Sequence, residues 1–212
     1  MLSKAVAALL VALMVSQAST TPTLNDLARL EATADNADWS LQAFPNGPFL
    51  NFTGTVETIY EELLRLNPNY EHEDWPEDLE DMPTFEEDME ITTTDSSVSA
   101  RQNPTDTLFC NNLRPQGWDN PLGKGAEYLK KLKGKPHLRA GPHVCKKVSC
   151  SWDTAIWWCN DNNHAKTLPS FRNIGDGATV IRDRCYRKTS RRISGELHHQ
   201  DKWSVKVFGD DC

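Results

Sequence analysis

The stretch Val144–Asp161 constrains the fold of this chain more than any other, because three of the six cysteines and three of the seven tryptophans lie within it. Two short runs rich in β-forming residues, Val144–Cys150 and Ala155–Cys159, flank a polar break at Ser151–Thr154. This pattern is typical of two β-strands in the core of a disulfide-stapled sheet.

The amino-terminal residues have the organisation of a secretory signal peptide. Lys4 supplies the positive charge, Ala5–Val15 is an apolar run of about 11 residues, and Ser16-Gln17-Ala18 is a small-residue cleavage site. The run is too short for a transmembrane helix, which needs about 20 residues, and no later stretch qualifies. We therefore expect cleavage after Ala18 and a secreted, extracellular protein with no transmembrane segment.

Secretion decides how the cysteines are interpreted, because an even number of them in an oxidising compartment predicts disulfides. A zinc site needs closely spaced ligands such as C-x-x-C, which these spacings do not supply, so we expect neither a metal nor a cofactor. The sequence predicts three disulfides among Cys110, Cys145, Cys150, Cys159, Cys185 and Cys212.

The pairing of these cysteines is less constrained than their number. Cys145 and Cys150 lie five residues apart, so they face opposite sides of a regular strand and should not pair with each other. A Cys150–Cys159 disulfide across the polar turn is favoured. The second helix and the carboxy-terminus would then be tied through Cys185 and Cys212 to Cys110 and Cys145, in either order.

Charge divides the chain into two parts. Residues 1–101 carry 4 Lys+Arg and 19 Asp+Glu, a net charge of −15, whereas residues 102–212 carry 19 and 11, a net charge of +8. Such asymmetry indicates parts that have different partners or that bind each other. We assign residues 1–18 to the signal peptide, residues 19–101 to an acidic pro-region or linker, and residues 102–212 to a basic, cysteine-rich mature domain.

Within the acidic part, apolar spacing predicts a helix over Leu24–Ala34 and a stronger one over Thr55–Leu66, with Thr55 as its cap. Asn51-Phe52-Thr53 is an N-glycosylation sequon, which makes Asn51 the expected glycan site. The carboxylate-rich stretch Glu71–Glu90 favours disorder.

The junction Ala100-Arg101-Gln102 ends the acidic part. We interpret Arg101 as the cleavage site of a pro-region, because proteolysis concentrates in exposed linkers. A permanently attached acidic tail is the alternative.

Within residues 102–212, the spacing of apolar residues predicts two helices, Gly125–Leu132 and Phe171–Cys185, and Ser170 is the expected N-cap of the second. Gly175 and Gly177 weaken the second helix by about 1 kcal/mol each relative to alanine, and we expect them to allow close packing on the sheet. Alternation over Ile193–His198 and Lys202–Val207 predicts a final hairpin. The order of these helices and strands along the chain predicts an α+β fold, in which an antiparallel sheet has helices on one face.

The signal peptide, the Ala-Arg-Gln junction and the block Cys145–Asp161 together resemble the small cysteine-rich secreted proteins of filamentous fungi, the group from which effector candidates are drawn. The block and the final hairpin cover about half of the chain. The resemblance implies secretion, Arg-directed processing and a disulfide-bonded α/β sandwich similar to that of killer toxins. It brings no catalytic residues with it.

One constellation has the chemistry of a catalyst. Glu196 and His198 lie at i and i+2 on one strand and hence on one face, with Lys206 expected opposite them. A carboxylate base, an imidazole acid and a cation are the groups that RNA cleavage needs. The same spacing is also typical of the outer face of an ordinary surface hairpin.

Other features predict binding. Trp157 and Trp158 are adjacent on a strand, so one should enter the core and the other should be partly exposed. The acidic stretch Glu71–Glu90 would suit a cover for the basic surface. That surface, which either binds an anionic polymer or is simply solvated, comprises Lys124, Lys130, Lys131, Lys133, Lys135, Lys146, Lys147, Arg182, Arg184, Arg187, Lys188, Arg191 and Arg192.

The sequence therefore favours a secreted, non-enzymatic effector or toxin-like protein that binds a host, competitor or cell-wall component. A small ribonuclease-like hydrolase that uses Glu196 and His198 is one alternative. A carbohydrate or cell-wall binding module is the other. The acidic pro-region is itself an expected partner of the basic domain.

Overall fold

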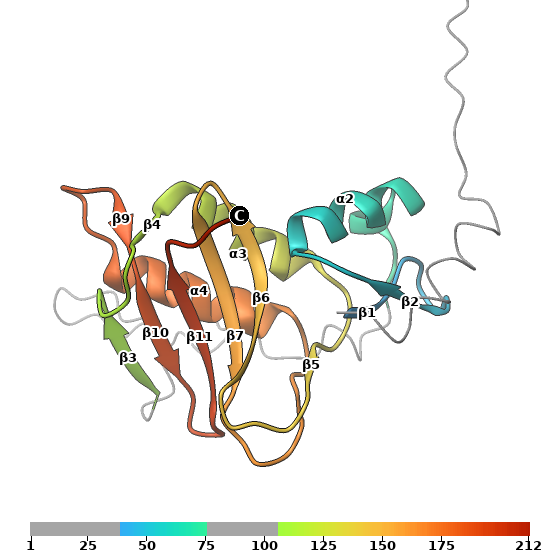
Figure 1. Cartoon of the computed structure of the whole chain (residues 1–212). Helices are drawn as coiled ribbons and strands as arrows, with labels where there is room; N and C mark the ends of the chain where they lie inside the picture. Colours follow the sequence, from blue (N-terminus) through green and yellow to red (C-terminus); the bar gives the residue numbers. More distant parts are fainter. Residues whose placement is uncertain (1–38, 76–105) are drawn as a thin grey trace, which may run out of the picture.

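The computed structural model of the chain describes residues 39–75 and 106–212 (Figure 1). Four sequence predictions lie outside these residues: cleavage after Ala18, the helix Leu24–Ala34, residues 76–90 of the acidic stretch, and processing at Arg101. Within the described ranges, no helix is both long enough and apolar enough to cross a membrane.

A five-stranded antiparallel sheet forms the centre of the molecule, in the order β3-β10-β11-β7-β6. The predicted central strands are confirmed as β6 (Val144–Ser151) and β7 (Thr154–Asn160). The predicted final hairpin is confirmed as β10 (Gly195–His198) and β11 (Trp203–Phe208). The two pairs join where β11 lies against β7, and β3 (Thr107–Cys110), which the sequence did not predict, adds an edge.

Two helices, α3 (Asp119–Lys131) and α4 (Arg172–Cys185), cover one face of this sheet (Figure 1). The α+β fold expected from the element order is therefore confirmed. α3 begins six residues before the predicted Gly125, because Pro121 is compatible with a first helical turn, where its missing N–H is not needed. The N-cap position of α4 is occupied by Phe171 rather than by the predicted Ser170. The Ser170 Oγ nevertheless accepts a hydrogen bond from the Arg172 N–H (3.1 Å) at the start of the helix.

The two glycines of α4 have different neighbours. A β-carbon at Gly177 would lie 2.8 Å from Val205 Cγ2, so this glycine allows the predicted close packing on the sheet. A β-carbon at Gly175 would lie 2.8 Å from the Ala126 carbonyl oxygen, so this glycine brings α4 against α3 instead. Each glycine therefore lowers the helix propensity of α4 but allows a close contact that a larger residue would block.

Three short ladders complete the described part. β4 (Gly117–Trp118) pairs with β9 (Arg192–Ile193), and β5 (His137–Leu138) pairs with β8 (Lys166–Thr167). β1 (Trp39–Gln42) and β2 (Phe49–Phe52) form an antiparallel hairpin within the acidic part, which the sequence did not predict.

The helix predicted over Thr55–Leu66 is confirmed as α2 (Val56–Leu66), and the 3₁₀ turn η2 (Tyr70–His72) follows it. Thr55 occupies the N-cap position, but its side chain does not cap the helix. Its carbonyl oxygen instead accepts hydrogen bonds from the Ile59 N–H (3.1 Å) and the Thr58 hydroxyl (2.9 Å). Residues 39–75 lie beside β6 and share one apolar core with the cysteine-rich part (Figure 1).

The three predicted disulfides are present as Cys110–Cys185, Cys145–Cys159 and Cys150–Cys212. The favoured Cys150–Cys159 pair is wrong, whereas the expectation that Cys145 and Cys150 do not pair is confirmed. The register explains the correction: Cys145 lies directly opposite Cys159, and Cys150 lies opposite Ala155 beyond an irregularity between Lys147 and Ser149. Cys212 consequently pairs with Cys150 rather than with Cys110 or Cys145.

Candidate functional site

The predicted Glu196–His198–Lys206 constellation comes together on the face of the sheet that α3 and α4 do not cover. Glu196 and Lys206 are cross-strand neighbours, with Lys206 Nζ 3.1 Å from Glu196 Oε2. His198 Nε2 lies 3.0 Å from the same oxygen, and Asn112 Nδ2 donates a hydrogen bond of 2.8 Å to Oε1. One carboxylate therefore contacts three polar side chains.

These contacts determine the charge of Glu196. Burial alone would raise the pKa of its carboxyl group, but the hydrogen bond and charge of Lys206, with His198 and Asn112, hold that pKa below its usual value. Glu196 is consequently an anion at neutral pH whose oxygens are already engaged, which makes it a weak proton acceptor.

An aromatic ring borders this cluster. Phe109 of β3 is 49% exposed and meets the His198 ring edge to face, with centroids 5.7 Å apart. The His198 side chain is 37% exposed, so its imidazole is open to solvent on this face. The cluster thus has an accessible imidazole, a cation and an exposed ring close together.

The two adjacent tryptophans of β7 separate as predicted. Trp158 is fully buried in the core, and Trp157 is half-buried on the opposite face. The Trp157 ring stacks on Phe208 at 6.2 Å, and its Nε1–H donates a hydrogen bond to Asp210 Oδ2 (3.1 Å). Lys147 pairs with the same Asp210 (3.0 Å), so the Trp157 ring and its N–H are held by protein contacts.

A second site lies at the end of the molecule where β6 turns into β7. It is a pocket of about 600 Å³, within the size range of small-molecule sites, roughly 300–1,000 Å³. Its walls come from the start of α3, the β6–β7 turn and the segment between α4 and β9. They comprise Trp118, Asp119, Asn120, Pro121, Lys124, Trp152, Asp153, Tyr186 and Arg191.

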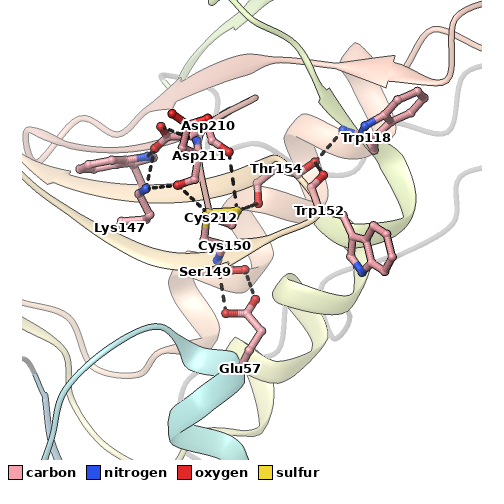
Figure 2. Close-up of a disulfide and its surroundings, with 11 residues drawn as sticks. Glu57, Trp118, Lys147, Ser149, Cys150, Trp152, Thr154, Asp210, Asp211 and Cys212 are labelled. Atoms are coloured by element: carbon pink, nitrogen blue, oxygen red, sulfur yellow. Dashed lines mark hydrogen bonds and ion pairs between the residues drawn. A yellow bond between two sulfur atoms is a disulfide. The ribbon is translucent and has the colours of Figure 1, made fainter.

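The two tryptophans of this pocket are the most exposed indoles of the described residues. Trp152 is 82% exposed and Trp118 is 38% exposed. Figure 2 shows both side chains projecting from the same end of the sheet, beyond Thr154 and away from the Cys150–Cys212 disulfide. The Thr154 hydroxyl joins their backbones, because its Oγ1 accepts from the Trp118 N–H (2.7 Å) and donates to the Trp152 carbonyl oxygen (3.3 Å).

The turn that carries Trp152 has an unusual backbone for its residues. Trp152 and Asp153 are the two central residues of the hairpin, with φ values of 47° and 53°. Two-residue hairpin turns with positive φ at both positions favour Asn and Gly, and a bulky residue there is a conformational outlier. Trp152 is therefore placed in solvent by a backbone that disfavours its own side chain.

The electrostatics of the pocket are mixed. Asp119 forms an ion pair with Arg182 (2.6 Å), which largely neutralises its charge and raises the pKa of the Arg182 guanidinium. Arg192 lies over the Trp118 ring, 3.3 Å from its centroid, and fixes the orientation of that indole. The pocket therefore combines the Trp118 indole, which Arg192 holds in place, with the Trp152 indole, which is exposed to solvent.

Part of the predicted basic surface is engaged with acidic or aromatic side chains. Lys130 pairs with Asp176 (3.0 Å) and Lys131 with Glu71 (3.1 Å). Lys146 lies over the Trp39 ring, 3.9 Å from its centroid. Two of these contacts come from the acidic part, as expected if the two parts bind each other. The expected glycan site, Asn51, lies half-buried in β2.

The sequence did not single out the pocket. Trp152 lies in the polar break Ser151–Thr154, but a turn predicted from sequence does not indicate how exposed its side chains are. Trp118 lies in a segment for which the sequence analysis predicts neither a helix nor a strand. Their meeting depends on the contact of both backbones with Thr154, a tertiary contact spanning 36 residues.

Comparison of the chain with protein-family models, with curated proteins and with solved structures finds no match. Within residues 39–75 and 106–212, no group of three or more histidine, cysteine, aspartate or glutamate side chains is arranged to hold a metal ion.

Proposed function

We propose that this protein is a secreted, non-enzymatic effector or toxin-like protein that binds a saccharide on the surface of a host or competitor cell through the Trp118–Trp152 pocket. The observation that carries the proposal is the 82% exposure of Trp152 on a turn with positive φ. Exposure forfeits about 1.5–3 kcal/mol of burial energy, and the backbone conformation adds strain. Because the Trp152 side chain lowers the stability of the fold, we infer that its role is in binding rather than in folding.

The lining of the pocket favours a sugar over an apolar peptide side chain. Its apolar surface comes from two indoles, a tyrosine ring and a proline, and no Leu, Ile, Val, Met or Phe lines it. Flat aromatic faces suit the flat apolar face of a pyranose ring, whereas Asn120, Asp153 and Lys124 supply donors and acceptors for hydroxyl groups. The signal peptide and the disulfides support a place of action outside the producing cell.

Isothermal titration of the purified protein with hexasaccharides of β-1,4-linked N-acetylglucosamine and of β-1,3-linked glucose tests the proposal. We expect one of them to bind and Trp152→Asn to abolish that binding, since asparagine keeps the turn but removes the indole. Phe49→Ala is the matched control, because Phe49 is 57% exposed in β2 and does not line the pocket. Binding of neither sugar, or equal binding by the Trp152 variant, would overturn the proposal.

RNA cleavage is the second candidate function, favoured by the contact of His198 and Lys206 with Glu196. His198 would protonate the leaving oxygen, Glu196 would accept a proton from the attacking hydroxyl, and Lys206 would face the phosphate. It ranks second because three donors already engage Glu196. Cleavage of single-stranded RNA by the protein, lost in both Glu196→Gln and His198→Ala, would place this function first.

A further inference from the structure

We infer that residues 39–75 are a permanent, non-covalently bound part of the folded protein and stay bound to residues 106–212 after the chain is cut between them. Among the described residues, the two parts share no covalent link besides the chain itself, because all three disulfides lie within Cys110–Cys212. Their association therefore depends entirely on the surfaces in contact.

The contact surface is chiefly apolar. Trp39 meets Phe171 edge to face at 5.2 Å, and Tyr60 meets Tyr128 at 5.0 Å. Leu41 is fully buried and lies so close to Gly134 that a β-carbon there would come within 2.7 Å of its Cδ2. Removal of residues 39–75 would expose a continuous apolar surface on the cysteine-rich part, which a secreted monomer rarely carries.

Partly buried hydrogen bonds fix the position of the segment. Tyr70 is buried, and its hydroxyl oxygen accepts a hydrogen bond from the Lys133 N–H (2.7 Å). The Glu57 carboxylate accepts bonds from the Ser149 hydroxyl (2.5 Å) and the Cys150 N–H (3.2 Å). β6 is an edge strand, so Glu57 satisfies a backbone donor that would otherwise remain open.

These contacts differ from those of a removable acidic cover. An acidic cover held to a basic surface by charge alone would separate from it at high salt, because salt shortens the Debye screening length to about 3 Å at 1 M. Here the ion pair Glu71–Lys131 lies at the exposed rim, and aromatic and aliphatic side chains fill the centre. Processing at Arg101 would therefore yield a protein of two bound chains.

The test uses the full chain with the site of a sequence-specific protease placed at residues 92–97. After complete cleavage, we expect both fragments to elute together on size exclusion at low salt and in about 1 M NaCl, and to separate only in denaturant. Separate elution at low salt would overturn the inference, and so would release by salt alone.

A pair of variants examines the specific contact. Glu57→Ala should release the amino-terminal fragment at least about tenfold faster than the unmodified sequence, because it leaves the Cys150 N–H unpaired. Glu61→Ala removes the same charge from the exposed side of α2 and should leave the rate unchanged. Equal acceleration by both variants would overturn the role of the Glu57 contact.

Discussion

Glu57 and Ser149 lie 92 residues apart in the chain, and the Ser149 hydroxyl donates a hydrogen bond to the Glu57 carboxylate (Figure 2). The same carboxylate accepts from the Cys150 N–H, next to the disulfide that holds the carboxy-terminus. This one side chain thus connects the acidic part, the edge strand β6 and the Cys150–Cys212 bridge.

Replacement of Glu57 by alanine should destabilise the uncut protein. Loss of the carboxylate leaves two donors of β6 without their partner, and the expected decrease in the free energy of unfolding is about 1–3 kcal/mol. Urea titration of the wild type and of Glu57→Ala measures it, with Glu61→Ala as the control on the exposed face. A decrease of equal size in the control would show that helix charge, rather than the contact with β6, is responsible.

Replacement of Trp152 by asparagine should stabilise the fold by about 0.5–1 kcal/mol. Asparagine tolerates the positive φ at this position far better than tryptophan, and an 82% exposed indole contributes little packing. Thermal unfolding of the two proteins checks this expectation. A lower melting temperature for Trp152→Asn would mean that the indole supports the fold, which would remove the main reason for assigning it to binding.

Glu196 should make stability depend on pH in the acid range. Because the folded state holds its pKa below the ordinary 4.5, the stabilisation is fully present above that pH and is lost as the pH falls through the folded pKa. Glu196→Gln should therefore be less stable than the wild type near neutrality, with the difference shrinking as the pH decreases from about 6 to about 3. Urea titrations at a series of pH values measure it.

Lys206→Met should lose the same acid-dependent stabilisation, because Lys206 supplies the main charge that lowers the Glu196 pKa. A pH-independent difference for both variants would contradict this assignment of the cluster.

The disulfides should differ in their contributions. The chain-entropy model predicts about 4 kcal/mol for closing a loop as long as that of Cys150–Cys212, with a separation of 62, and about 3 kcal/mol for Cys145–Cys159, with a separation of 14. Paired serine variants of each bridge, compared by urea unfolding, measure the order. The reverse order would show that local geometry at the cross-strand bridge outweighs loop entropy.

The strand pattern of the sheet was predictable because residues on one face alternate with those on the other. Ile156, Trp158, Val205 and Val207 are all buried, and each lies in a predicted strand. The disulfide pairing was not predictable in the same way. It depends on the register of β6 against β7, and an irregularity near Val148 shifts that register without a signal in the pattern.

The packing of residues 39–75 on the cysteine-rich part could not be predicted from composition either. Their acidic character suggested a removable segment, but apolar side chains such as Leu41, Tyr60 and Leu63 occur at spacings that bury them. Their partner surface on α3 and β6 exists only after the sheet forms. Of the candidate sites, the Glu196–His198–Lys206 cluster followed from strand periodicity, whereas the tryptophan pocket required three segments distant in sequence to meet.

The most direct test of the binding proposal is a titration followed by the indole N–H signals in a two-dimensional ¹⁵N–¹H NMR spectrum. Each of the seven tryptophans contributes one such signal, and the signals are assigned from single-tryptophan variants. On addition of the hexasaccharides, we predict that the signals of Trp118 and Trp152 shift with saturation while that of Trp157 stays in place. Shifts confined to Trp157, or no shift at any tryptophan, would contradict the account.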